Sequence, residues 1–176
     1  MRSPATRLHR NPTGRRRVRM PMPAARSVNR PIPAPPNWTP CATCEKPESK
    51  LWYNDGRWWG ALFGTTDRLT IFTLDPKSQV WADTGTLIDE RAIADADMLS
   101  TGAHLWAVSG GSRPSENHAI RVRRFTYDAA DKRYAIDPDF PVTIRPTGAS
   151  PAVIVVDSTD TVWVAYAADG KVWVSH

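Results

Sequence analysis

The first 44 residues contain no acidic side chain, and no lysine occurs before Lys46. This segment holds nine of the 23 Lys and Arg residues, all of them arginine, and nine of the 16 prolines. Its apolar residues are too few and too scattered to offset the entropy cost of ordering a chain. We therefore predict a disordered tail over residues 1–47. The sequence pI of about 9.6 reflects this tail, because the remainder carries more acidic than basic residues.

Long apolar runs are also missing. No stretch approaches the ~20 apolar residues that a membrane-spanning helix needs. No apolar run follows the basic residues Arg15, Arg16 and Arg17, so no secretory signal peptide is evident. The prolines would break the amphipathic helix of an organelle transit peptide. The sequence therefore predicts no membrane span.

Cysteine is scarce, with Cys41 and Cys44 as the only two, in a C-x-x-C arrangement. A redox pair needs a helix N-terminus that lowers the thiol pKa, and a structural zinc needs two further ligands. Neither accompanies the pair, and the histidines are isolated from it and from one another. We expect a small disulfide or two free thiols, and we predict neither a metal site nor a cofactor.

Helical periodicity is absent after the tail. The best candidate segment, residues 88–99, would scatter its acidic side chains around a helix, so we expect a loop or a single turn there. Strand chemistry is present instead, since residues 153–156 are all β-branched. The tripeptides 54–56 and 168–170 supply residues that tolerate the positive φ of tight hairpins. The chain is therefore expected to be all-β.

Three tryptophans indicate an internal repeat, because each lies in the second of two adjacent strand-like runs. Trp59 and Trp106 are 47 residues apart, and Trp106 and Trp163 are 57 apart. One four-stranded propeller blade takes ~40 to 50 residues. We predict a partial β-propeller of about two and a half four-stranded antiparallel blades over residues 48–176. The blades are expected at about 48–90, 91–146 and 150–176, with the last one incomplete.

Residues 50–59 and 124–144 resemble sialidase-like propeller domains of the BNR or Asp-box type, which occur in large bacterial extracellular proteins. Residues 73–81 are similar to a degenerate Asp-box turn, one residue longer and without the glycine. The resemblance covers roughly residues 46–176 and implies a ring of about six blades and an extracellular location. The catalytic set of true sialidases is not assigned in this sequence. Arg91 and Asp97 are the only positions to test for such a role.

Blade geometry predicts one face that carries the second-to-third-strand loops together with the links between blades. The long segments 84–97, 110–118 and 145–150 fall there, and loops on rigid scaffolds are where binding residues usually lie. Paired carboxylates such as Asp95 and Asp97 suit acid and base work in glycoside hydrolysis, although most acidic loop residues cap turns or face water. Besides the catalytic candidates Arg91 and Asp97, the predicted ligand-binding residues are Asp95, Arg113, Glu116 and His118.

Three functions remain open at this point. The first is a non-catalytic propeller segment of a larger protein, a binding or packing module for a glycan or a neighbouring domain. The second is a truncated, sialidase-like glycoside hydrolase that lacks most of its catalytic residues. The third is nucleic-acid binding, in which the arginine-rich tail would neutralise phosphates. The alternative for the tail is a solvated extension with no binding role. Open blade edges would also allow self-association.

Overall fold

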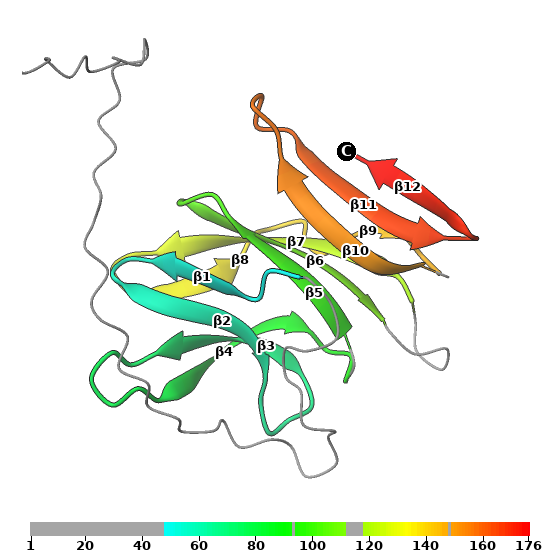
Figure 1. Cartoon of the computed structure of the whole chain (residues 1–176). Helices are drawn as coiled ribbons and strands as arrows, with labels where there is room; N and C mark the ends of the chain where they lie inside the picture. Colours follow the sequence, from blue (N-terminus) through cyan, green and yellow to red (C-terminus); the bar gives the residue numbers. More distant parts are fainter. Residues whose placement is uncertain (1–47, 93, 112–117, 148) are drawn as a thin grey trace, which may run out of the picture.

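The computed structural model describes residues 48–92, 94–111, 118–147 and 149–176. These residues form twelve β-strands and no helix. The strands make three antiparallel sheets, none of which closes on itself (Figure 1). The predicted all-β class is therefore confirmed. The predicted tail over residues 1–47 and the two cysteines lie outside the described residues.

Each sheet is a run of strands that are consecutive in the sequence. Sheet 1 has the order β1 (Leu51–Asn54), β2 (Arg57–Phe63), β3 (Leu69–Leu74), β4 (Trp81–Asp89). Sheet 2 has the order β5 (Ala94–Ser100), β6 (His104–Gly111), β7 (Ile120–Asp128), β8 (Arg133–Ile136), and β9 (Val142–Arg145) pairs with the first half of β7. Sheet 3 has the order β10 (Ala149–Val156), β11 (Val162–Ala168), β12 (Lys171–Ser175).

Two hairpins use the turns that the sequence predicts. Asp55 and Gly56 have φ of 47° and 75° between β1 and β2, and Asp169 and Gly170 have φ of 51° and 68° between β11 and β12. Positive φ at both central residues is the type I′ geometry, whose twist matches that of the flanking strands. Aspartate and glycine occupy these positions because they tolerate the left-handed region best.

The expected loop over residues 88–99 is wrong. Ile88 and Asp89 end β4, and β5 occupies Ala94–Ser100, so only a short link separates the two strands. The acidic residues of this segment made it look like a loop, because acidic side chains usually face water. Asp89 and Asp97 are instead buried and bonded within strands. A pattern read only from hydrophobicity misses strands whose inward positions carry satisfied carboxylates.

Sheet 2 lies between the other two sheets (Figure 1). One core cluster joins sheets 1 and 2 and includes Trp59, Ile71, Leu105 and Phe125. A second cluster joins sheets 2 and 3, with Val108 and Ile120 on one side and residues such as Ile154 and Val164 on the other. The strands of sheet 2 are therefore buried on both surfaces, as their apolar runs require.

The three marker tryptophans each lie in the second strand of a sheet, as predicted: Trp59 in β2, Trp106 in β6 and Trp163 in β11. Trp59 belongs to the core between sheets 1 and 2, and Trp106 packs against the core between sheets 2 and 3. Trp163 pairs with Val155, whose side chain is 57% exposed on the surface of sheet 3 that faces away from sheet 2. The first two tryptophans thus point toward the following sheet, and the third points to solvent.

Tyr134 of β8 connects sheet 2 to sheet 1. Its ring lies 5.1 Å from Trp59 in an edge-to-face arrangement, and the residue is 2% exposed. Its hydroxyl accepts hydrogen bonds from Trp52 Nε1 at 3.0 Å and from Asn54 Nδ2 at 2.8 Å. The tyrosine therefore supplies the acceptor for the buried indole N–H of Trp52.

We expect Tyr134→Phe to lower the free energy of unfolding by about 2 kcal/mol, because the buried Trp52 N–H loses its acceptor. Urea denaturation followed by tryptophan fluorescence would measure this change. Tyr53→Phe is the matched control, since Tyr53 is 58% exposed and should change stability by less than about 0.5 kcal/mol. Equal effects of the two substitutions would contradict the role of the Tyr134 hydroxyl.

Candidate functional site: an arginine-lined cleft

A cleft of roughly 630 Å³ lies where the outer strand of sheet 1 meets the outer strand of sheet 2. Thr86 Oγ1 of β4 donates a hydrogen bond to the main-chain oxygen of Tyr134 in β8 at 3.0 Å and so joins the two strands. The lining combines apolar side chains with one carboxylate and three arginines. Its residues are Thr84, Gly85, Thr86, Leu87, Glu90, Arg121, Arg123, Arg133, Tyr134, Ala135, Ile136 and Pro141.

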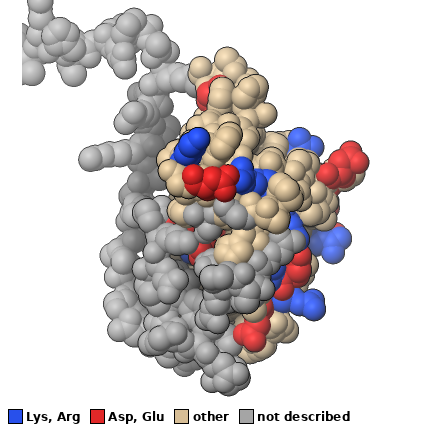
Figure 2. Space-filling model, turned by 90° about the vertical axis from the view of Figure 1, so that its right-hand side faces the viewer, with Lys and Arg blue, Asp and Glu red and all other residues tan. Residues whose placement is uncertain are grey.

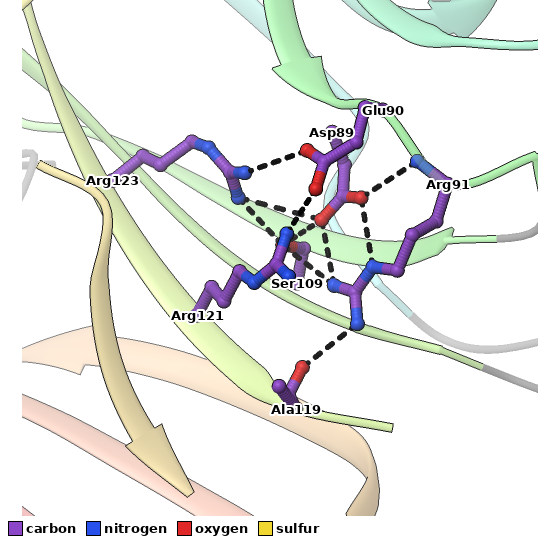
Figure 3. Close-up of polar contacts among 7 residues, drawn as sticks. All are labelled: Asp89, Glu90, Arg91, Ser109, Ala119, Arg121 and Arg123. Atoms are coloured by element: carbon purple, nitrogen blue, oxygen red, sulfur yellow. Dashed lines mark hydrogen bonds and ion pairs between the residues drawn. The ribbon is translucent and has the colours of Figure 1, made fainter. Parts of the chain in front are cut away.

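Behind the cleft, the Asp89 carboxylate is fully buried and bonded on both oxygens (Figure 3). Arg91 Nε donates to Asp89 Oδ1 at 2.8 Å, and Arg91 Nη2 donates to Oδ2 at 2.7 Å, which is a bidentate pair. Ser109 Oγ donates to Oδ2 at 2.6 Å. Arg123 Nη1 lies 3.4 Å from the same oxygen and 3.0 Å from Ser109 Oγ. We call Asp89, Arg91, Ser109 and Arg123 the buried network.

Charge balance in the buried network shifts the pKa values of its members. Burial by itself raises the pKa of Asp89, but hydrogen bonds from Arg91 and Ser109 more than offset it, so the pKa lies below its usual value. Burial lowers the pKa of Arg123 from its ordinary value, against the opposing effect of Asp89 and Glu90. Asp89 is therefore ionised at neutral pH and holds two guanidinium groups in fixed positions.

Glu90 lies at the open side of the cleft. Arg121 Nη1 donates to Glu90 Oε1, and Arg123 Nη2 donates to Oε2 at 3.3 Å. The Glu90 side chain is 47% exposed, whereas that of Arg123 is 5% exposed. Burial raises the pKa of Glu90, while bonds from its own backbone and from Arg121 bring it below its usual value. The partly exposed Glu90 carboxylate thus accepts hydrogen bonds from both Arg121 and Arg123.

Strand periodicity explains why the two arginines face the same carboxylate. Arg121 and Arg123 are two residues apart on β7, and side chains at that spacing point to one side of a sheet. Glu90 directly follows β4, and Thr86 holds that strand against β8. Glu90, which follows the last strand of sheet 1, therefore lies over Arg121 and Arg123 of sheet 2.

Of the residues predicted from the sequence, Arg91 lies at this site but within the buried network. Its Nη1 also donates to the main-chain oxygen of Ala119 at 2.9 Å. The link after β4 and the end of the β6–β7 loop therefore meet at one end of the sheets, as the strand parity predicts. The guanidinium is bonded to Asp89 and to the backbone, so its contacts are structural.

Asp97, the other catalytic candidate, lies on β5 and is 8% exposed. Its Oδ1 accepts from the Ser49 N–H at 2.7 Å, and its Oδ2 accepts from the Ile154 N–H at 2.9 Å. Ser49 precedes β1 and Ile154 belongs to β10, so one carboxylate joins all three sheets. Its two hydrogen-bond donors, the Ser49 and Ile154 N–H groups, are not part of the buried network around Arg91.

Of the other four candidates, two belong to the described residues. Asp95 is half-buried on β5 and pairs with Gly110 across the β5–β6 ladder. His118 is half-buried, and its buried Nε2 has no hydrogen-bond partner in the structure described. Arg113 and Glu116 lie outside the described residues.

The residues of this site that the sequence did not predict are Asp89, Glu90, Ser109, Arg121 and Arg123. The signal that was available is the position of Arg121 and Arg123 in alternation with the apolar Ile120 and Val122 in the first half of β7. Two arginines on the inward side of a strand require partners, because a buried unpaired charge is costly. The partners could not be read from the sequence, since they belong to another sheet.

Among the described residues, no group of three or more His, Cys, Asp or Glu side chains could hold a metal ion. The part of the chain that is described also contains no helix of the length and apolarity needed to cross a membrane. On the face shown in Figure 2, lysine and arginine side chains alternate with aspartate and glutamate, and neither sign dominates. The described residues visible on that face therefore form no single-sign patch for a polyanion.

Comparison with known proteins returns no matching family model, no matching curated protein and no matching solved structure. The resemblance to sialidase-like propellers is therefore still a prediction.

Proposed function

We propose that this chain is a non-catalytic, propeller-type module that binds an anionic ligand in the cleft between β4 and β8. One observation carries the proposal. Arg121 and Arg123 line a cleft of suitable size, and both donate to Glu90, a carboxylate whose side chain is 47% exposed. A ligand carboxylate can take the place of Glu90 with the same hydrogen bonds.

Support for the propeller-type architecture comes from the stacking of the sheets. Three antiparallel sheets of consecutive strands pack surface to surface, and a tryptophan in the second strand of each points in the same direction along the stack. Asp97 bonds the backbone next to the first strands of sheets 1 and 3. In blades arranged around an axis, the first strands lie close together and the last strands lie apart. The bonds of Asp97 near the first strands and the cleft between the last strands β4 and β8 fit that arrangement.

The non-catalytic assignment rests on the bonding of the candidate groups. The Arg91 guanidinium is bonded to Asp89 and Ala119, and the Asp97 carboxylate is bonded to two backbone N–H groups. A general acid or nucleophile needs a group that can reach a substrate. Neither side chain has that freedom, so no contact of these two residues favours the glycoside hydrolase alternative.

The chemistry of the cleft indicates the ligand class. Planar guanidinium groups bind carboxylates and phosphates in a bidentate manner, and Asp89 and Ser109 keep Arg123 in place. The volume of roughly 630 Å³ lies in the range of small-ligand pockets. Leu87, Ile136 and Pro141 supply an apolar wall. The ligand expected is a carboxylate attached to a body the size of a sugar or an amino acid.

Titration calorimetry with glucuronate and glucose, which differ in the carboxylate, tests this proposal. We expect glucuronate alone to bind. Arg121→Gln should weaken binding about tenfold, because one charge-assisted hydrogen bond is lost. Glu90→Gln should strengthen it severalfold, because the competing carboxylate is removed.

Lys77→Gln is the matched control, because it makes the same charge change outside the cleft lining and should leave binding unaltered. An acidic dipeptide that binds in place of glucuronate would assign the site to acidic peptides. Equal binding of glucose and glucuronate, or weaker binding in Glu90→Gln, would refute the anion site.

A further inference from the structure

The cleft between β4 and β8 extends well beyond the side chains around Glu90. At one end, the Thr86 hydroxyl of β4 meets the main chain of Tyr134 in β8. At the other end, Glu90 accepts hydrogen bonds from Arg121 and Arg123. Thr86 and Glu90 are four residues apart, so at ~3.3 Å per residue of extended chain the two ends lie about 13 Å apart.

The strand pairing of sheet 2 gives the same length. Tyr134 is paired with Tyr127 of β7, and Arg123 lies four residues before Tyr127 on that strand. Arg133, which also lines the cleft, precedes Tyr134 and is paired with Asp128. Arg133 and Arg123 therefore belong to opposite ends of the cleft.

Arg133 is a second basic position that a ligand can reach. Its Nη2 lies 3.2 Å from Asp131 Oδ2, and the two side chains are 64% and 56% exposed. An ion pair with this exposure contributes little to stability, so an anionic group of a ligand can replace Asp131 at small cost. A ligand with one carboxylate, bound in place of Glu90, would leave this second position unused.

The middle of the cleft is apolar. Leu87 lies on β4 between the two ends, and Ile136 is paired with Phe125, between the two arginine positions along β7. Leu87 is 39% exposed and Ile136 is 45% exposed. Sugar rings present a C–H face to such side chains, and their rigid geometry holds carboxylates on neighbouring rings at fixed intervals. The cleft therefore has a basic group at each end and an apolar surface between them.

An extended peptide fits this cleft less well, because the edge of β8 is already engaged. Thr86 Oγ1 donates to the main-chain oxygen of Tyr134 at 3.0 Å. A peptide that added to β8 as a further strand would need the outward-facing main-chain groups of that strand. The Thr86 side chain stands where such a strand would lie.

We propose that the cleft binds an acidic oligosaccharide, a chain of linked uronic acid units, along its whole length. One carboxylate replaces Glu90 at Arg121 and Arg123, a carboxylate further along the chain contacts Arg133, and the rings between them pack on the apolar middle. A single sugar ring spans less than half of the cleft, so contact with both ends requires a chain. This inference rests on the proposed anion site and adds the length of the ligand and the number of its charges.

Titration calorimetry of the full chain with galacturonate, trigalacturonate and maltotriose tests the proposal, since maltotriose has the length without the carboxylates. We expect trigalacturonate to bind at least tenfold more tightly than galacturonate, because a second charge-assisted contact forms. Maltotriose should not bind. Arg133→Gln should weaken the binding of trigalacturonate about tenfold and that of galacturonate by less than about twofold.

Lys132→Gln is the matched control, because it makes the same charge change one residue away and outside the cleft lining. It should leave the affinity for both acids unaltered. Equal affinities for the two acids, or equal losses of both in Arg133→Gln, would overturn the inference and leave the anion site standing. If the wild type bound neither acid, the anion site would fail and this inference with it. Triglutamate that bound in place of trigalacturonate, with the same dependence on Arg133, would overturn the assignment to a sugar chain.

Discussion

Asp89→Asn is expected to lower the free energy of unfolding by about 3 to 5 kcal/mol at pH 7, the cost of removing one partner from a buried ion pair. Asp89 is fully buried, and its carboxylate is bonded by Arg91, Ser109 and Arg123. The asparagine fits the same space but leaves two buried guanidinium groups with less countercharge. Urea denaturation with circular dichroism measures the change. Because small domains are marginally stable, a loss of this size would unfold a large share of the molecules.

Asp131→Asn is the control for this substitution. It removes the ion pair with Arg133, whose side chains are 56% and 64% exposed, and should cost at most about 1 kcal/mol. Ser109→Ala provides a milder probe, since it removes one donor to Asp89 and should cost about 1 to 2 kcal/mol. If Asp89→Asn were no more destabilising than Asp131→Asn, the buried network would not contribute to stability.

The same network predicts a pH dependence with a defined sign. The pKa of Asp89 is lower in the folded chain than its unfolded value of about 3.9. Its contribution is therefore fully present above pH ~3.9 and is lost as the pH falls through the folded pKa. Asparagine mimics the protonated acid, so the stability difference between wild type and Asp89→Asn should narrow over that range. A difference that stays constant down to pH 2 would contradict the assignment.

The fold could be predicted from the sequence where local chemistry decides the structure. Asp55-Gly56 and Asp169-Gly170 demand hairpins, because few other residues adopt positive φ at both positions. The tryptophan spacing located the second strand of each sheet. These signals lie within a few residues of one another, so no knowledge of the tertiary structure was needed.

The prediction failed where burial depends on a partner that is distant in the sequence. Asp97 looks like a solvated loop residue until its two bonded N–H groups, from Ser49 and Ile154, are known. The cleft was missed for the same reason, since Glu90 and Arg121 come from different sheets. Carboxylates and guanidinium groups are assigned to the surface by default, and only the assembled sheets show which are paired.

Asp97→Asn should cost about 3 kcal/mol, because the asparagine keeps one acceptor oxygen and turns an NH₂ group toward the other backbone donor. Hydrogen bonds to a charged acceptor contribute about 1.5 to 3 kcal/mol each, and an unsatisfied buried N–H adds its desolvation cost. The loss should appear at two separate places. Hydrogen exchange should accelerate at the Ser49 amide, before sheet 1, and at the Ile154 amide, in sheet 3.

Ser100→Ala, on the same strand, is the control and should leave both amides protected. The pattern of exchange separates the structural role from a general loss of stability. Met98 N donates to the Ser49 main-chain oxygen at 2.8 Å whether or not residue 97 is charged, so protection at Met98 should outlast that at Ser49. If all three amides exchanged equally fast, the chain would be unfolding as a whole and Asp97 would not act as a local tie. If protection from exchange were lost only at the Ser49 and Ile154 amides, one carboxylate would be shown to hold the first strands of three sheets together. Both of its oxygens are then engaged in structural bonds, which leaves no free oxygen for catalysis.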